Sequence, residues 1–159
     1  MLKVNKKVEY ALMALKFMVE KGGELTSARE ICDHFKTPFD TTAKVMQVMN
    51  SHNILTSVKG IKGGYTVSTD LSQISYLTLA RMIEAKEVKS ICQTNKGLCE
   101  LHCDCNIVNP MSTLSEKLNQ FLNSLSIQEL LFGEEFSDTN KLCPIKDIVK
   151  DINTNGTQV

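Results

Sequence analysis

No stretch of this 159-residue chain is apolar for long enough to span a membrane. A transmembrane helix needs about 18 or more consecutive apolar residues. The basic N-terminus precedes an apolar segment, as in an export signal, but Glu9 and Lys16 interrupt that segment and no small-residue cleavage site follows. We therefore expect a cytoplasmic protein with no membrane partner.

A catalytic motif is also missing. The three histidines, His34, His52 and His102, match neither a catalytic triad nor the ligand spacing of a metalloenzyme. We therefore expect that the protein is not an enzyme. Its apolar fraction of 42% and charged fraction of 23% are ordinary for a globular protein. Its length allows one domain with a core, or a small domain with an appendage.

The chain has no net charge at neutral pH, but its charges are unevenly divided. Residues 1–75 hold ten Lys and Arg against seven Asp and Glu, a net charge of +3. Residues 76–159 hold eight against eleven, a net charge of −3. A basic half joined to an acidic half indicates that the first half faces a polyanion.

Cysteine is concentrated in one short segment. Four of the six cysteines, Cys92, Cys99, Cys103 and Cys105, lie within fourteen residues. A reducing compartment disfavours disulfides and favours metal or redox chemistry. Zinc ligands are usually separated by two to four residues, whereas here the separations are wider or narrower. Wide thiolate spacing in a loop with Gly97 suits an iron–sulfur cluster. Buried, inert cysteines are the less favoured alternative in so polar a loop.

The other two cysteines lie far from this segment. Cys32 falls on a predicted helix and is expected to be a small core residue. Cys143 precedes a proline in a predicted loose tail over residues 133–159, and we assign it no role.

Two helices are predicted at the N-terminus. Apolar residues recur at helical spacing over residues 5–20, with Val19 as the last of them, and Gly22-Gly23 ends this helix. Ser27 and Glu30 then form a capping box, in which the Ser hydroxyl caps a free amide and the Glu reaches back. It begins a short second helix that runs to about His34.

A third helix is predicted to begin with Thr37 as cap and Pro38 at the first helical position, and to end near Ser51. Its apolar residues are expected to face inward: Phe39, Val45, Met46 and Met49. Asp40 is expected on the outer face, and the residues expected to contact DNA are Thr41, Thr42, Lys44 and Gln47. Such side chains contact phosphates or base edges, but an ordinary solvated helix face is an equal alternative.

A β-hairpin is predicted next. Residues 54–58 and 65–68 are β-branched, partly alternating runs joined by a glycine-rich turn. The expected DNA contacts of this hairpin are Lys59, Lys62, Gly63, Gly64 and Tyr65. Glycines beside lysines allow close approach to a narrow groove; the alternative is a surface hairpin whose lysines protect a sheet edge. Three helices followed by this hairpin predict a winged helix-turn-helix DNA-binding domain over residues 1–75.

The remaining chain is predicted to be mostly helical. A short helix over residues 76–86 leads to the cysteine loop, and Asn109-Pro110 repeats the cap-plus-proline start of a longer helix. A narrow apolar seam follows on that helix: Leu114, Leu118, Phe121 and Leu125. The seam suits a dimer interface, and packing on the chain's own core is an equal alternative. Ser126 and Glu129 form another capping box.

These residues resemble the IscR/NsrR family of bacterial iron–sulfur transcription regulators over roughly residues 1–132. The resemblance is carried by VEYALMAL, by SVKGIKGGYTV, by the spaced cysteines and by LSEKLNQFLNSLSIQELL. It implies a mostly α-helical homodimeric repressor that binds palindromic promoter DNA. It also implies a cluster-binding loop and dimerisation helices over residues 76–132.

The resemblance assigns Cys92, Cys99 and Cys105 as cluster ligands and leaves the fourth ligand open. Val108 stands where IscR-like members have a histidine. Glu9 matches a carboxylate that related sensors supply from the partner subunit and is the leading candidate; the others are His34, His102 and Cys103. A two-iron (2Fe–2S) cluster is favoured slightly over a four-iron (4Fe–4S) one. Ala43-Lys44 replaces a Glu-Gln pair of that family, so its operator sequence is not transferable.

Two alternatives remain at this point. In the first, the winged helix is controlled by zinc or by a reversible disulfide instead of a cluster. In the second, the protein is an iron–sulfur electron carrier with no DNA partner, which the lysine-bearing hairpin disfavours.

Overall fold

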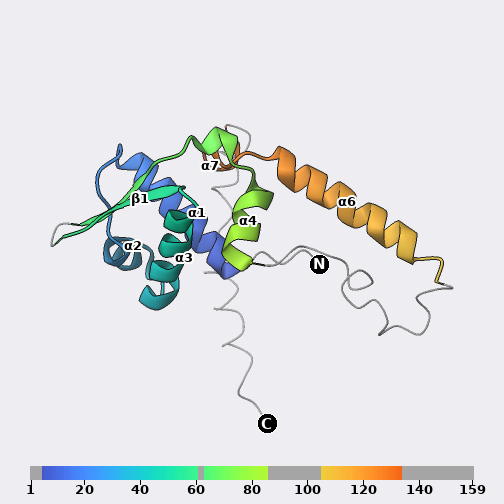
Figure 1. Ribbon diagram of the computed structural model, residues 1–159, viewed down its shortest axis with the longest axis horizontal. Coiled ribbons are helices and arrows are strands. Elements are labelled where there is room, and N and C mark those ends of the chain that lie inside the picture. The colour runs from blue at the N-terminus through green and yellow to red at the C-terminus, as the bar shows by residue number, and fades with distance from the viewer. Residues whose placement is uncertain (1–4, 61–62, 86–104, 134–159) are drawn as a thin grey trace, which may run out of the picture.

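The described part of the chain is mostly helical, with one two-stranded antiparallel hairpin (Figure 1). The computed structural model describes residues 5–60, 63–85 and 105–133. The elements, in order, are α1 (Lys6–Glu20), α2 (Ala28–Phe35), α3 (Phe39–Ser51), β1 (Leu55–Val58), β2 (Gly64–Val67), the 3₁₀ turn η1 (Leu71–Gln73), α4 (Tyr76–Glu84), α6 (Val108–Ser124) and α7 (Ile127–Phe132). The predicted three helices and hairpin of a winged helix-turn-helix are confirmed.

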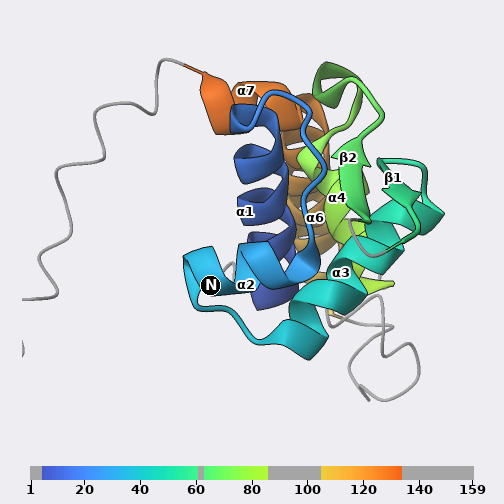
Figure 2. The ribbon, with the colours of Figure 1, turned by 90° about the vertical axis from the view of Figure 1, so that its left-hand side faces the viewer.

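Helix α1 lies in the middle of the fold and contacts α2, α3, α4, β2 and α7 (Figure 2). Its buried stripe is fully enclosed and consists of Val8, Ala11, Ala14, Leu15 and Met18. Val19 was expected on this stripe, but it is 37% exposed because it lies at the C-terminal end of the helix, beyond its neighbours. The side chain of Asn5 caps the other end by accepting from the amide of Lys7 at 3.0 Å.

Helix α2 begins with half of the predicted capping box. Ser27 Oγ accepts a hydrogen bond from the amide of Glu30 at 3.1 Å, as predicted. The Glu30 carboxylate does not reach back to Ser27; instead it accepts from Lys21 Nζ at 2.6 Å. The same ammonium lies 5.8 Å from the centre of the Phe17 ring. An ion pair and an aromatic contact therefore join the end of α1 to the start of α2.

Helix α3 begins one residue later than predicted. Pro38 occupies the N-cap position and Phe39 is the first helical residue, with no side-chain cap. Thr37 was expected to cap the helix, but its hydroxyl is bonded to Thr42 at 2.9 Å. The predicted inward positions Val45, Met46 and Met49 are buried. The prediction for Phe39 is wrong: its side chain is 48% exposed, because it precedes the buried stripe at the free end of the helix.

The hairpin is paired from Leu55↔Val67 to Val58↔Gly64. It is docked on the segment before α2 by a second backbone pairing. The Thr26 amide donates to the Tyr65 carbonyl at 3.0 Å, and the Tyr65 amide donates to the Thr26 carbonyl at 2.9 Å. The base of the hairpin therefore has a fixed position relative to α2.

Helix α6 projects from the winged-helix body (Figure 1). It begins at Val108 with Ile107 as N-cap, so the prediction of a start capped by Asn109 is wrong. Pro110 is tolerated there because the first turn of a helix has no intrahelical amide bonds to lose. Among the described elements, no helix is long and apolar enough to cross a membrane.

The C-terminal end of α6 is hydrogen-bonded to the segment before α4. The Tyr76 amide donates to the Leu125 carbonyl at 2.8 Å, and the Ile127 amide donates to the Ile74 carbonyl at 2.8 Å. Half of the capping box predicted at the start of α7 is present, with Ser126 Oγ accepting from the Glu129 amide at 3.0 Å.

Candidate nucleic-acid interface and thiol segment

The outer face of α3 is polar and accessible. Asp40, Lys44 and Gln47 are exposed, and Thr41 is half-buried. Asp40, Lys44 and Gln47 lie on the side of α3 away from the buried Met46 and Met49, whereas Thr41 lies beside the buried Val45. The helix therefore presents one cation, one amide and one hydroxyl to solvent beside a single carboxylate, a set that suits phosphates and base edges.

The structure corrects the prediction for Thr42. Its side chain is 1% exposed, and its hydroxyl donates to Thr37 Oγ1 at 2.9 Å. A threonine enclosed in this way has no free surface to present to DNA. The hydrogen bond satisfies the buried Thr42 hydroxyl and links α3 to Thr37 in the turn between α2 and α3.

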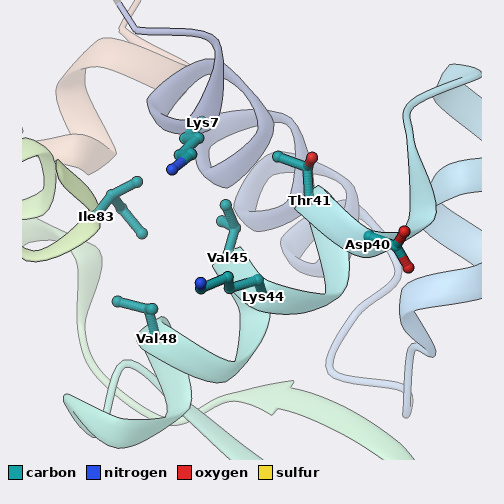
Figure 3. Close-up of a pocket in the computed structure, with 7 residues that line it drawn as sticks. All are labelled: Lys7, Asp40, Thr41, Lys44, Val45, Val48 and Ile83. Atoms are coloured by element: carbon teal, nitrogen blue, oxygen red, sulfur yellow. The ribbon is translucent and has the colours of Figure 1, made fainter.

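A pocket of about 250 Å³ lies beside α3, between it and the ends of α1 and α4. Lys7 and Ile83 point across the gap toward Val45 and Lys44 (Figure 3). Two ammonium groups thus border an apolar floor next to the outer face of α3. Because paired cations attract phosphates, Lys7 adds a second cation beside Lys44 at this pocket.

Lys7 was missed in the sequence. It is exposed and lies in the first turn of α1. The signal was available: lysines at positions 3, 6 and 7 form a basic cluster at the N-terminus. Their meaning depends on the packing of α1 against α3, which the sequence does not display.

A second, more open hollow of about 420 Å³ separates the hairpin from the start of α2. Lys59 lies on the hairpin side and is exposed, while Ser27 and Ala28 lie on the helix side. The hollow therefore has a lysine on one side and the first turn of a helix on the other. Lys62, the other predicted hairpin cation, lies outside the described residues.

The hairpin glycines are required by the backbone around them. A Cβ on Gly63 would lie 2.3 Å from the Val58 carbonyl oxygen, and one on Gly64 would lie 3.0 Å from the Thr26 backbone. Tyr65 is half-buried and packs against the core. These three residues therefore build and dock the hairpin. Their contact with DNA stays a prediction.

Of the predicted cluster ligands, the structure describes Cys105 and Glu9. Cys92, Cys99, Cys103 and His102 lie outside the described residues, as does Cys143. Cys105 is half-buried and precedes α6; its carbonyl accepts from the Val108 amide at 3.5 Å. Cys32 is 8% exposed, in line with the core role expected of it. Within the described residues, no three His, Cys, Asp or Glu side chains are grouped to hold a metal.

Glu9 on α1 acts electrostatically on Tyr76 of α4. Burial raises the pKa of the Tyr76 phenol above its ordinary value of 10.0, and the negative charges of Glu84 and Glu9 raise it further. Glu9 itself is half-buried. The phenol of Tyr76 is therefore within electrostatic range of both Glu84 and the candidate fourth ligand.

His34, another candidate for the fourth ligand, is exposed and lies against two aromatic rings. Its ring lies 4.8 Å from that of Phe17 and 4.6 Å from that of Phe35, centre to centre. It also occupies the last turn of α2, where a histidine interacts favourably with the helix dipole.

The predicted seam of α6 is open to solvent over most of its length. Leu114, Leu118 and Phe121 are 49%, 37% and 59% exposed, and Leu125 is half-buried at the anchored end. Of the alternatives for this seam, packing on the chain's own core is not what the described residues show. A run of exposed apolar side chains on one helix face marks an interaction surface.

The family described as "Rrf2: Iron-dependent Transcriptional regulator" matches residues 4–132. Over 130 residues the chain is 25% identical to an HTH-type transcriptional regulator of Aquifex aeolicus, covering 80% of this chain and 90% of that protein. Over 138 residues it is 24% identical to the HTH-type transcriptional regulator IscR of Sodalis glossinidius, covering 86% and 83%. These relatives are transcriptional regulators and not enzymes, as expected.

Solved structures share the fold. CymR, the global cysteine regulator of B. subtilis, aligns with a TM-score of 0.60 and 18% identity, covering 82% of this chain and 97% of CymR. T. potens IscR aligns with a TM-score of 0.60 and 15% identity, covering 89% and 93%. The mostly helical winged-helix fold predicted from the sequence is therefore confirmed.

The placement of Glu9 near Tyr76 has a measurable consequence. Glu9→Gln removes a negative charge that disfavours the phenolate, so the pKa of Tyr76 should fall. An absorbance titration of the phenol measures it, with Tyr76→Phe identifying the signal. Because the folded state raises this pKa, the stability it contributes is complete below pH 10.0 and is lost at higher pH. Glu20→Gln, on the exposed surface of the same helix, is the control; an unchanged Tyr76 titration in Glu9→Gln would contradict the placement.

Proposed function

The chain belongs to the Rrf2 family of transcriptional regulators, and on this premise we propose that it is a cytoplasmic, homodimeric repressor whose promoter binding is controlled by an iron–sulfur cluster. The observation that carries the DNA-binding part is an exposed lysine on each of two elements that share one core. Lys44 on α3 and Lys59 on the hairpin are both exposed, on elements fixed to the same core.

Helix α3 and the hairpin are proposed to contact different parts of the DNA. In helix-turn-helix proteins the recognition helix enters the major groove, and side chains around it contact the phosphates. Here α3 carries Lys44 and Gln47 for the major groove. Lys7 beside it, and Lys59 across the hollow at the start of α2, suit the flanking phosphates.

Helix α6 is the proposed dimer interface. Its exposed seam would be covered by the same seam of a second copy, because a two-fold axis brings identical patches together. Two copies carry two recognition helices, and these suit two half-sites about 34–36 Å apart on a palindromic operator. The apolar surface that the single chain leaves exposed would then be buried.

The proposed cluster ligands are Cys92, Cys99, Cys105 and Glu9. Three thiolates and a carboxylate are a donor set that suits iron, so the residues fit the group. When bound, the cluster would supply a redox-active iron centre, in agreement with the iron dependence by which the family is described. A two-iron cluster is proposed slightly ahead of a four-iron one.

The described residues offer a physical route from thiols to DNA. Cys105 lies three residues before the start of α6, and the other end of α6 is hydrogen-bonded to the segment that begins α4. α4 in turn packs on α1 and α3. A change at the thiols therefore changes the setting of α6 and, in the dimer, the spacing of the two recognition helices. This is a coupling between two sites in the thermodynamic sense.

A thiol switch or a zinc site is the second candidate. CymR, which has the same fold, has also been solved from Staphylococcus aureus in an oxidised form, with a TM-score of 0.58. A cysteine-rich segment without a cluster would respond to oxidation by forming a disulfide, for instance between Cys99 and Cys105. The electron-carrier alternative is disfavoured by the family match.

DNA binding is tested by salt dependence. On an operator obtained by in vitro selection from random DNA, Lys44→Ala and Lys59→Ala should each weaken binding. Each should reduce the slope of log K against log salt by about 0.9 for every phosphate that the variant no longer neutralises. Lys117→Ala on α6 removes the same charge away from the interface and should leave the slope unchanged. Slopes equal to that of the wild type in both variants would remove these lysines from the interface.

The cluster is tested by iron and sulfide counts and visible absorption of anaerobically purified protein. Changing Cys92, Cys99 or Cys105 to Ser should abolish the chromophore, whereas Cys103→Ser should retain it as a matched control. Glu9→Gln should alter it. With all three ligand cysteines changed to Ala, operator affinity should no longer depend on cluster reconstitution. A colourless protein with bound zinc, or a metal-free protein that loses free thiols on oxidation, would favour the second candidate.

Dimerisation is tested by a charge on the seam. Leu118→Asp should give a monomer by light scattering, because it places a carboxylate in an apolar contact between copies. Gln120→Asp introduces a carboxylate at an exposed position of α6 outside the seam and should remain dimeric. A Leu118→Asp protein that keeps the wild-type mass would exclude this face.

A further inference from the structure

Phe39 is a large aromatic side chain exposed at the first position of α3. Its side chain is 48% exposed, although sequence periodicity predicts it to be inward. The residues that follow Phe39 in the first turn of α3 and face solvent are polar. An apolar ring at the leading end of a recognition helix is therefore a feature that packing of this chain does not explain.

The ring is paired with a cation from the neighbouring helix. The guanidinium carbon of Arg29, in the first turn of α2, lies 5.7 Å from the centre of the Phe39 ring. This is within the range of a cation–π contact. Arg29 is itself exposed. The two side chains thus join the start of α2 to the start of α3 on the outside of the helix-turn-helix.

The position of the pair matches the geometry of DNA recognition. In helix-turn-helix proteins the N-terminal residues of the recognition helix contact base edges, while the helix before it crosses the backbone. Phe39 belongs to the first group and Arg29 to the second. At about 100° per residue, Phe39 lies about 80° from Gln47 and on the same side as Ala43. Phe39 therefore extends the outer face of α3 toward α2.

We propose that Arg29 and Phe39 form a unit that determines operator specificity. The Phe39 ring contacts the C5-methyl group of a thymine in the major groove, a contact suited to apolar side chains. Arg29, held against the ring, contacts the phosphate beside it, since a guanidinium stacks on an aromatic face and donates to phosphate at the same time. This inference rests on the proposed DNA binding and adds to it a base preference.

Uracil substitution tests the contact atom by atom, because uracil differs from thymine only in lacking the methyl group. In the selected operator, each thymine is replaced in turn by uracil. For the wild type, one position in each half-site should lose about fourfold in affinity per methyl contact, the value of one methyl group removed from water. In Phe39→Ala that position should become insensitive to the replacement, while Phe39→Leu should retain part of the effect.

Arg29→Gln should behave differently. It should weaken binding to the thymine and uracil operators by the same factor and reduce the salt slope, because a phosphate contact carries no base information. Leu25→Ala removes a similarly exposed apolar side chain, 40% exposed, before α2 and should change neither property. Thermal unfolding of each variant establishes that it is folded.

The outcomes separate the two proposals. If wild-type protein selects no sequence from random DNA, the proposed DNA binding fails, and this inference with it. If it selects an operator but Phe39→Ala retains the wild-type pattern of uracil sensitivity, the Arg29–Phe39 unit is wrong and the DNA binding stands.

Discussion

The burial of one helix stripe is the constraint on which the remaining structure depends. Ala11, Ala14 and Leu15 of α1 are completely enclosed, and every other described α-helix except α6 rests on or near this stripe. The two alanines are small, so neighbouring helices approach α1 closely. Because α3 buries its apolar side here, its polar side must face outward. Helix α4 packs on α1 and also contacts α6, so the position of α6 depends on the same core. The exposed basic surface is thus a consequence of how α1 is covered.

The sequence predicts the helices and the hairpin well because apolar periodicity reports which face of a segment is buried. It does not report where along a helix the neighbouring element ends. Val19 and Phe39 were both assigned to apolar faces, and both are exposed because they lie at helix ends, where neighbouring elements cover them less. The predicted starts of α3 at Pro38 and of α6 after Asn109 are also displaced by one or two residues. The hydroxyl of Thr37, a good cap by residue type, is bonded to Thr42 instead.

The candidate site was predictable to the extent that it is local in sequence. Lys44 and Lys59 could be assigned because each lies on an element whose exposed face follows from its own pattern. Lys7 and Arg29 could not, because their relevance comes from their position beside α3 across the fold. The glycines of the hairpin have two possible explanations: close approach of the backbone to DNA, or close approach of Gly64 to Thr26. The structure supplies the second directly through the distances a Cβ would have.

The anchoring of α6 at its C-terminal end makes it a lever. Its 17 residues, at about 1.5 Å each, give an arm of about 25 Å. The fulcrum is the pair of backbone hydrogen bonds that join Leu125 and Ile127 to the segment before α4. A tilt of about 10° at that fulcrum displaces the Cys105 end of the arm by about 4 Å. Conversely, a displacement of a few ångströms at Cys105 would correspond to a rotation of α6 by about 10° relative to the winged-helix body.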